Sequence, residues 1–219
     1  MKQNYLHQFI RRLRVNLKTS YELKKESFAN YEDLTLTYIF FEKEDINNIE
    51  IKFETFREVE FRRCRLNNVT FSDTFLGKVK FQNCELNNVT FTGTSLSKVV
   101  FDNCKLISAS FFEANLNDVN IIESLIEYSK IENSKMENSF FDDVKLMENI
   151  HRHNKYENTK FYKCNLNREN FIDTTFKKCD LKTSHFEDTK INIDDLITSK
   201  LSILNLLEIV SSKGIIIEE

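Results

Sequence analysis

Residues 61–80 read FRRCRLNNVTFSDTFLGKVK, residues 81–100 read FQNCELNNVTFTGTSLSKVV, and residues 101–120 read FDNCKLISASFFEANLNDVN. Phe, Cys and Leu recur at the same places in the three rows, and a shorter period of five runs within each row. A step of five advances an α-helix by about 500°, so side chains at that spacing form no stripe along it. In a flat strand an odd step alternates between the two faces. The period therefore requires a chain that bends once every five residues.

Four straight sides close a square turn of twenty residues, which accounts for both periods and predicts a solenoid. Every fifth residue from Leu36 to Leu206 points inward, which gives 35 positions, and only His151 among them is not apolar when Tyr156 is counted as apolar. A second inward position lies two residues earlier and holds only Val, Cys, Thr, Ala or Ser between residues 59 and 144. The 35 positions correspond to about nine coils, in a rod of roughly 40 Å at the spacing of parallel strands.

Runs such as CRLNN, CELNN, CKLIS and CNLNR, alternating with VTFSD, VKFQN and TTFKK, resemble the pentapeptide-repeat family over about residues 34–206. The resemblance implies an all-β solenoid, a right-handed quadrilateral β-helix, with its side chains filling the interior. We expect an N-terminal amphipathic helix or cap at residues 1–28, the repeat β-helix at residues 29–203, and a C-terminal helix and strand at residues 204–219.

The composition excludes several classes of site. The chain has no Pro and three Gly, which excludes glycine-rich phosphate loops, and no catalytic motif is present, so we expect neither an enzyme nor a small-molecule substrate or cofactor. All five Cys occupy the small inward position without CxxC pairs, which predicts buried structural thiols and no metal. Because free thiols persist in reducing compartments, we expect a cytoplasmic protein, and no transmembrane segment or secretory signal is visible.

Departures from the pattern are few. Glu44 and Glu54 occupy the small inward position and predict a frayed or distorted early coil. Asn67, Asn68, Asn87 and Asn88 fall at outward corners, where Asn tolerates tight bends, and we expect them to form ladders between coils.

The segment ENIHRHNKYEN leaves two interpretations open. Asn149 and Asn154 replace small residues there, and His151 replaces a large apolar one. Either His151 and His153 bind a metal or ligand, or a distorted coil holds hydrogen-bonded polar side chains. Glu169 is a similar inward fault, and a buried carboxylate requires a partner.

Residues 5–24 have helical spacing and a basic character. Leu6, Phe9, Ile10, Leu13 and Leu17 share one face, and residues 1–25 carry seven basic and one acidic side chain. One interpretation is a cap on the exposed edge of the first coil. The other is an arm that binds an anionic membrane or a partner.

The outward positions between residues 100 and 150 are unusually apolar, which predicts a protein-binding or dimer surface around one corner of the rod. Coverage by a terminal helix, or a local bulge, is the alternative. The candidate partner surface consists of Val100, Ile107, Ile122, Leu125, Tyr128, Phe140 and Met147.

The tail LSILNLLEIVSSKGIII predicts a short helix stopped by Gly214 and then an apolar strand. It resembles the tails of quinolone-resistance and microcin-resistance members of the family, and in the former that region supports a homodimer. A simple C-terminal cap fits equally well. The candidate dimer element consists of Leu204, Leu206, Leu207, Ile209, Val210 and Ile215.

The resemblance also suggests a function as a DNA mimic that binds a type II topoisomerase, DNA gyrase or topoisomerase IV. Mimicry needs dense negative charge, whereas residues 34–206 hold 27 acidic and 23 basic side chains and no protruding loop. The alternative is a general interaction scaffold that uses the apolar corner or the basic arm; direct nucleic-acid binding is not expected of an acidic rod. The candidate acidic surface consists of Asp45, Glu50, Glu58, Glu60, Asp142 and Asp143.

Overall fold

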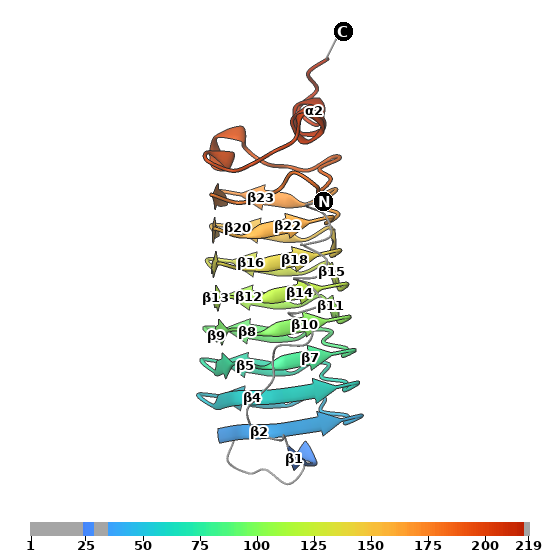
Figure 1. Cartoon of the computed structure of the whole chain (residues 1–219), viewed down its shortest axis with the longest axis vertical. Helices are drawn as coiled ribbons and strands as arrows, with labels where there is room; N and C mark the ends of the chain where they lie inside the picture. The colour runs from blue at the N-terminus through green and yellow to red at the C-terminus, as the bar shows by residue number, and fades with distance from the viewer. Residues whose placement is uncertain (1–23, 29–34, 217–219) are drawn as a thin grey trace, which may run out of the picture.

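The computed structural model describes residues 24–28 and 35–216 as a rod of coils stacked along one axis (Figure 1). Strand β1 (Lys24–Lys25) lies at one end of the rod and helix α2 (Ile203–Ser211) at the other. The expected N-terminal helix falls outside the described residues except for Lys24, which pairs in a parallel ladder with Ile39. The expected all-β solenoid is confirmed.

Each turn of twenty residues has four sides, and each side stacks in parallel on the equivalent side of the next turn, so that residue n pairs with residue n+20. The first side consists of β2 (Thr35–Glu42), β4 (Thr55–Arg62), β7 (Lys80–Gln82), β10 (Val100–Asp102), β14 (Asn120–Ile122), β18 (Phe140–Asp142) and β22 (Lys160–Tyr162). The second side consists of β11 (Lys105–Ile107), β15 (Leu125–Glu127) and β19 (Lys145–Met147), continued by isolated bridges.

The third side consists of β3 (Glu50–Lys52), β5 (Thr70–Ser72), β8 (Thr90–Thr92), β12 (Ser110–Phe112), β16 (Lys130–Glu132), β20 (Ile150–Arg152) and β23 (Asn170–Ile172). The fourth consists of β6 (Phe75–Gly77), β9 (Ser95–Ser97), β13 (Asn115–Asn117), β17 (Lys135–Glu137), β21 (Lys155–Glu157) and β24 (Thr175–Lys177), with β2 and β4 running across the corner between this side and the first.

The bend that the sequence period requires is a left-handed backbone residue at each corner. Every fifth residue from Tyr38 to Lys178 has a φ between 47° and 63°, and only Gly93 among them is a glycine. A non-glycine residue in this region costs about 1–2 kcal/mol. At most corners the N–H donates to a backbone carbonyl of the next coil, as in Asn83 N–H to the Asp102 carbonyl at 2.9 Å, so the bend satisfies these donors. Asn side chains add the expected ladder, with Asn68 Nδ2 donating to Asn48 Oδ1 at 2.9 Å.

The inward side chains form a continuous core along the axis. Phe81 is fully buried between Phe61 and Phe101, with its ring centroid 5.0 Å from each of theirs and planes tilted by only 6°. Phe71 and Phe91 stack in the same way at 5.3 Å. Like residues therefore stack on like at intervals of twenty, because the register places them there.

The described rod has about seven strand-bearing turns, fewer than the nine expected, because the last levels are held only by isolated bridges such as Asp180 to Lys200. The inward register also ends earlier than expected. Leu206 lies on α2 and is 42% exposed, so its predicted inward placement is wrong. The first coils are regular: Glu44 and Glu54 are half-buried beside intact ladders rather than in a frayed coil.

Phe81→Ala removes a ring that is enclosed on both sides, and the rigid coil spacing prevents collapse into the space. We expect a loss of about 3–5 kcal/mol in the free energy of unfolding, measured by chemical denaturation. Phe53→Ala, at a corner where the side chain is 77% exposed, is the matched control and should change it by less than about 0.5 kcal/mol. Equal effects at the two positions would contradict the assigned inward register.

Candidate functional site

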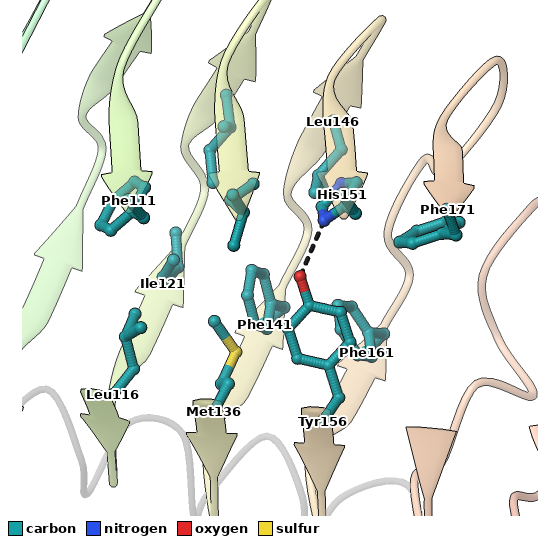
Figure 2. A pocket seen from close by; sticks show the side chains of 12 residues that line it. Phe111, Leu116, Ile121, Met136, Phe141, Leu146, His151, Tyr156, Phe161 and Phe171 are labelled. Atoms are coloured by element: carbon teal, nitrogen blue, oxygen red, sulfur yellow. Dashed lines mark hydrogen bonds between the residues drawn. The ribbon is translucent and has the colours of Figure 1, made fainter. Parts of the chain in front are cut away.

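A small cavity lies inside the tube between Phe111 and Phe171 (Figure 2). From Leu116 to Met136 five consecutive inward positions hold no aromatic side chain. The cavity volume is about 20 Å³, close to that of one water molecule, and every lining residue is buried. The wall is apolar except for His151 and Tyr156, so the space suits no substrate of ordinary size.

His151 and Glu169 form a buried polar pair at one end of this cavity. His151 Nε2 lies 2.8 Å from Glu169 Oε2, and their side chains are 4% and 0% exposed. The Tyr156 hydroxyl lies 2.7 Å from His151 Nδ1 (Figure 2), while Asn149 Nδ2 donates to Glu169 Oε1 at 3.1 Å. Burial, and then the Glu169 charge, raise the pKa of the Tyr156 phenol, which keeps its hydroxyl a donor. The buried carboxylate thus has the partners that the sequence argument required.

The two histidines of the irregular segment point to opposite sides of the wall. His153 is at an outward corner, with its side chain 54% exposed and Nδ1 3.5 Å from Asp173 Oδ2. Within the described residues no group of three His, Cys, Asp or Glu side chains is placed to hold a metal ion. The coil itself is undistorted, since His151 pairs in register with Ile131 and Phe171. The expectation of a distorted coil is wrong, because Asn149 and Asn154 donate to backbone carbonyls of the preceding coil.

The five cysteines are free and buried, as predicted. Cys64, Cys84 and Cys104 stack at intervals of twenty, and the hydrogen bond with Cys104 raises the pKa of the Cys84 thiol to about 12. Burial raises the pKa of Cys164 to about 12 and that of Cys179 to about 11. Because the thiolate is the reactive form, the raised pKa values disfavour nucleophilic chemistry at Cys84, Cys164 and Cys179.

Most members of the candidate acidic surface are paired with a cation. Asp45 is bound by Arg65, whose hydrogen bonds lower the pKa of the Asp45 carboxyl. Glu58 lies 2.7 Å from Lys78 and Glu60 2.5 Å from Arg62, and Glu50 lies 2.8 Å from Lys52. Two of these pairs, Asp45 with Arg65 and Glu58 with Lys78, join residues twenty apart, so the repeat length alone could have predicted them. The local negative charge at this end of the rod is therefore largely neutralised.

The members of the candidate partner surface range from exposed to buried. Tyr128 and Met147, on the second side, are 54% and 38% exposed. Ile107 and Leu125 are half-buried there, as are Val100 and Phe140 on the first side. Ile122 is only 2% exposed although it points outward. The charges of Glu148 and Glu127 raise the pKa of the Tyr128 phenol, so the exposed apolar side has an acidic rim.

The C-terminal helix both closes the core and presents apolar side chains. Ile209 is fully buried, and Asn205 Nδ2 donates to the Ser184 carbonyl at 2.6 Å. Ser202 and Asn205 form a reciprocal capping box at the helix start. The helix ends at Ser211, and the described residues after Gly214 form no strand, which differs from the expected tail.

Of the candidate dimer element, Leu204, Leu206, Leu207 and Ile215 are 40–54% exposed, Val210 is half-buried, and Ile209 belongs to the core. Sequence reasoning missed Ile193, Ile197 and Ile203, which are 45%, 67% and 79% exposed at the same end of the rod. Ile193 occupies an outward position of the five-residue period, and an apolar residue at such a position is the sequence signal that could have identified it. Across the described part of the chain, no helix is both long and apolar enough to cross a membrane.

His151→Phe should remove the partner of the buried Glu169 charge and lower the free energy of unfolding by about 3–5 kcal/mol. The double variant His151→Phe/Glu169→Leu removes the buried carboxylate together with its partner and should be more stable than His151→Phe alone. Chemical denaturation of the wild type, the single variants His151→Phe and Glu169→Leu, and the double variant gives the coupling energy. Asp173→Asn, at the exposed His153 pair, is the control and should change stability by less than about 1 kcal/mol. A double variant less stable than the single one would contradict the pairing.

Comparisons with known proteins agree with this fold. Residues 54–131 match the model of a pentapeptide repeat region. HetL, a pentapeptide repeat protein involved in heterocyst differentiation regulation from the cyanobacterium Nostoc, is similar in structure, with a TM-score of 0.55 and 11% identity over 78% of this chain and 86% of HetL. No curated protein matches the sequence.

QnrB1, a plasmid-mediated fluoroquinolone resistance protein, is similar with a TM-score of 0.51 and 18% identity over 85% of this chain and 100% of that one. At sequence identities of 11% and 18%, the similarity to HetL and QnrB1 shows a shared fold but no shared activity. The strands on either side of residues 54–131 continue the same stacking at intervals of twenty. The chain thus contains a pentapeptide repeat region at residues 54–131, which confirms the resemblance seen in the sequence.

Proposed function

We propose that the chain is a non-enzymatic protein-binding solenoid that contacts its partner through its outer walls. The observation that carries this proposal is the exposed apolar surface at Tyr128 and Met147, together with the apolar C-terminal end. The cavity inside the described coils has a volume of only about 20 Å³, too small for a ligand of ordinary size, which favours the outer walls as the place for recognition. Exposed apolar patches of this kind mark contacts with other proteins.

A type II topoisomerase, DNA gyrase or topoisomerase IV, is the partner to test first. The support is the shape of the rod and its likeness in fold to QnrB1. The charge pattern counts against mimicry by a stripe of free carboxylates, because Asp45 and Glu58 are each paired with a cation of the next coil. The topoisomerase would then contact mainly the apolar side chains of Tyr128 and Met147, beside which the carboxylates of Glu127 and Glu148 lie, and not a row of unpaired carboxylates. The general interaction scaffold remains the second candidate, favoured by the same pairing of the acidic surface.

In a DNA-supercoiling assay with purified gyrase, we expect the protein to inhibit supercoiling or to protect the enzyme from a quinolone at micromolar concentration. The double variant Tyr128→Ser/Met147→Ser should weaken this effect about tenfold, since two central apolar contacts are worth more than 1.4 kcal/mol. Asp45→Asn/Glu58→Gln is the matched control on the paired acidic surface and should have little effect. No effect of the wild-type protein at micromolar concentration removes topoisomerases and leaves the scaffold reading.

We further propose that the C-terminal end forms a homodimer. Leu204 and Leu207 lie on one α-helix with Ile203, and all three are at least 40% exposed. A second copy would cover these side chains by a two-fold contact, in which the same patch serves both subunits. Ile209 is not part of this contact because it fills the core beneath the helix.

Leu204→Glu/Leu207→Glu should convert a dimeric wild type into a monomer in sedimentation or light-scattering measurements, because two buried charges would face their copies. Tyr128→Glu, on the far side wall, is the control for non-specific effects and should leave the dimer intact. A dimer that survives the helix variant but not the Tyr128 variant would move the interface to the corner. A monomeric wild type at tens of micromolar would remove the dimer altogether.

A further inference from the structure

The last coil of the rod keeps part of its hydrogen-bonding edge open. On the second side, helix α2 takes the place of a further coil, since the Phe186 N–H donates to Glu208 Oε2 at 2.8 Å. At the next corner Ser212 Oγ donates to the Thr189 carbonyl at 3.2 Å. Ile191 holds on the third side the position that Phe186 holds on the second, and neither its N–H nor its carbonyl has a hydrogen-bond partner among the described residues. The capping of the edge therefore stops before Ile191.

The two open groups of Ile191 are directed along the rod axis, toward its C-terminal end. Phe171 lies twenty residues earlier in the same column and donates its N–H to the Lys190 carbonyl of the following coil at 2.8 Å. The Ile191 N–H points the same way, and so does its carbonyl, because alternate residues of a parallel ladder direct both groups to one neighbouring strand. An open edge of this kind is a template for pairing with another chain.

The open edge lies in a cleft of about 490 Å³ at the end of the rod. Residues 188–192 of the last coil line this cleft together with Phe171 and with Ser212 and Lys213, which follow α2. Ligand sites in proteins commonly have volumes of about 300–1,000 Å³, so the cleft can hold a short stretch of chain. None of its lining residues belongs to the surfaces proposed above around Tyr128 and Leu204, which makes it a separate site.

The charges of the cleft indicate what stands beside the pairing residue of an occupant. The charged side chains that line it are Lys190, Lys213 and Asp188, which together are net positive. Lys190 is exposed and forms no ion pair with another described residue. Elsewhere in the rod, side chains twenty residues apart pair acid with base, as Glu157 Oε1 with Lys177 Nζ at 3.2 Å. An acidic residue stacked on Lys190 would repeat that arrangement.

We propose that this edge binds an extended segment of a partner protein as an added strand, parallel like the ladders beneath it. The segment has the pattern acidic, β-branched, polar. Its β-branched residue stacks on Ile191 and prolongs the inward column, while the acidic residue lies beside Lys190 and the polar one beside Asn192. The acidic residue accepts the Ile191 N–H, and the polar residue donates to the Ile191 carbonyl. Main-chain bonds thus supply affinity, and the side chains supply specificity.

Amide chemical shifts of the full chain, titrated with the blocked peptide acetyl-Gly-Glu-Ile-Thr-Gly-amide, test the site. We expect the largest shifts at residues 188–192 and slower hydrogen exchange of the Ile191 amide, with half-saturation at or below about 1 mM peptide. If these amides stay unshifted at that concentration, or the shifts gather elsewhere on the rod, the proposal is wrong.

Two N-methylated forms of the probe distinguish strand pairing from general apolar contact. Methylation of the Thr amide removes the donor to the Ile191 carbonyl and should weaken binding about tenfold. Methylation of the Ile amide, which points away from the rod in a parallel pair, should change binding by less than about twofold. The reverse order of effects would mean an antiparallel strand, and equal binding of both forms would mean no strand pairing. Either result overturns the proposal.

Exchange of charges locates the acidic residue of the occupant. Lys190→Glu should weaken binding of the probe about fivefold, and a probe with Lys in place of its Glu should recover most of the loss. Lys178→Glu, at an exposed corner outside the cleft, makes the same change in net charge and should leave the binding of both probes unchanged. A loss that the exchanged probe does not recover contradicts the pairing with Lys190.

Two further measurements identify other occupants. If sodium acetate alone shifts the amides of residues 188–192 as far as the probe does, the cleft is an anion site and the strand proposal fails. If these amides shift on dilution of the protein without any peptide, a second copy occupies the edge, and the proposal of a partner segment fails as well. We expect neither acetate nor dilution to shift them.

Discussion

The structure depends on one recurring constraint, a left-handed residue every five positions whose backbone N–H is hydrogen-bonded to the next coil. The bend turns the chain by one side of the square, and the hydrogen bond ties that corner to the coil above, as at Asn83 and Asp102. The strain of the bend, about 1–2 kcal/mol per non-glycine corner, persists because the stacked coil over-determines it. Straight sides of three residues, inward pairs and stacked rings all follow from this geometry.

The sequence predicts the inside of the rod much better than its outside. The inward positions from Leu36 to Leu201 can be predicted because the interior of a closed tube accepts mainly apolar or small side chains. The stacking of the cysteines follows from the same register. The left-handed corners are harder to predict, because Lys, Glu and Arg occupy many of them beside Asn, and only Gly93 among them is a glycine. The end of the period is misplaced at Leu206 because an apolar helix residue satisfies a five-residue count by coincidence.

The candidate surfaces are only partly predictable for a related reason. Outward residues follow no simple rule of burial, so the sequence predicts that Ile122 points outward but not that its side chain is buried. Charge counts along the chain also miss pairs such as Asp45 with Arg65, which form between coils and alter the surface presented to a partner. The useful unit for such a surface is the column of residues twenty apart, and not the linear stretch.

The polar group at His151, Asn149 and Glu169 has a consequence for how the coils find their places. In a tube lined by near-identical repeats, a coil displaced by five or twenty residues would still bury Phe and Leu against Phe and Leu, with little penalty. Such a displacement would set Glu169 against a hydrocarbon wall and leave Asn149 without its carboxylate. The polar group therefore disfavours shifted alignments and favours the one register in which these three side chains meet.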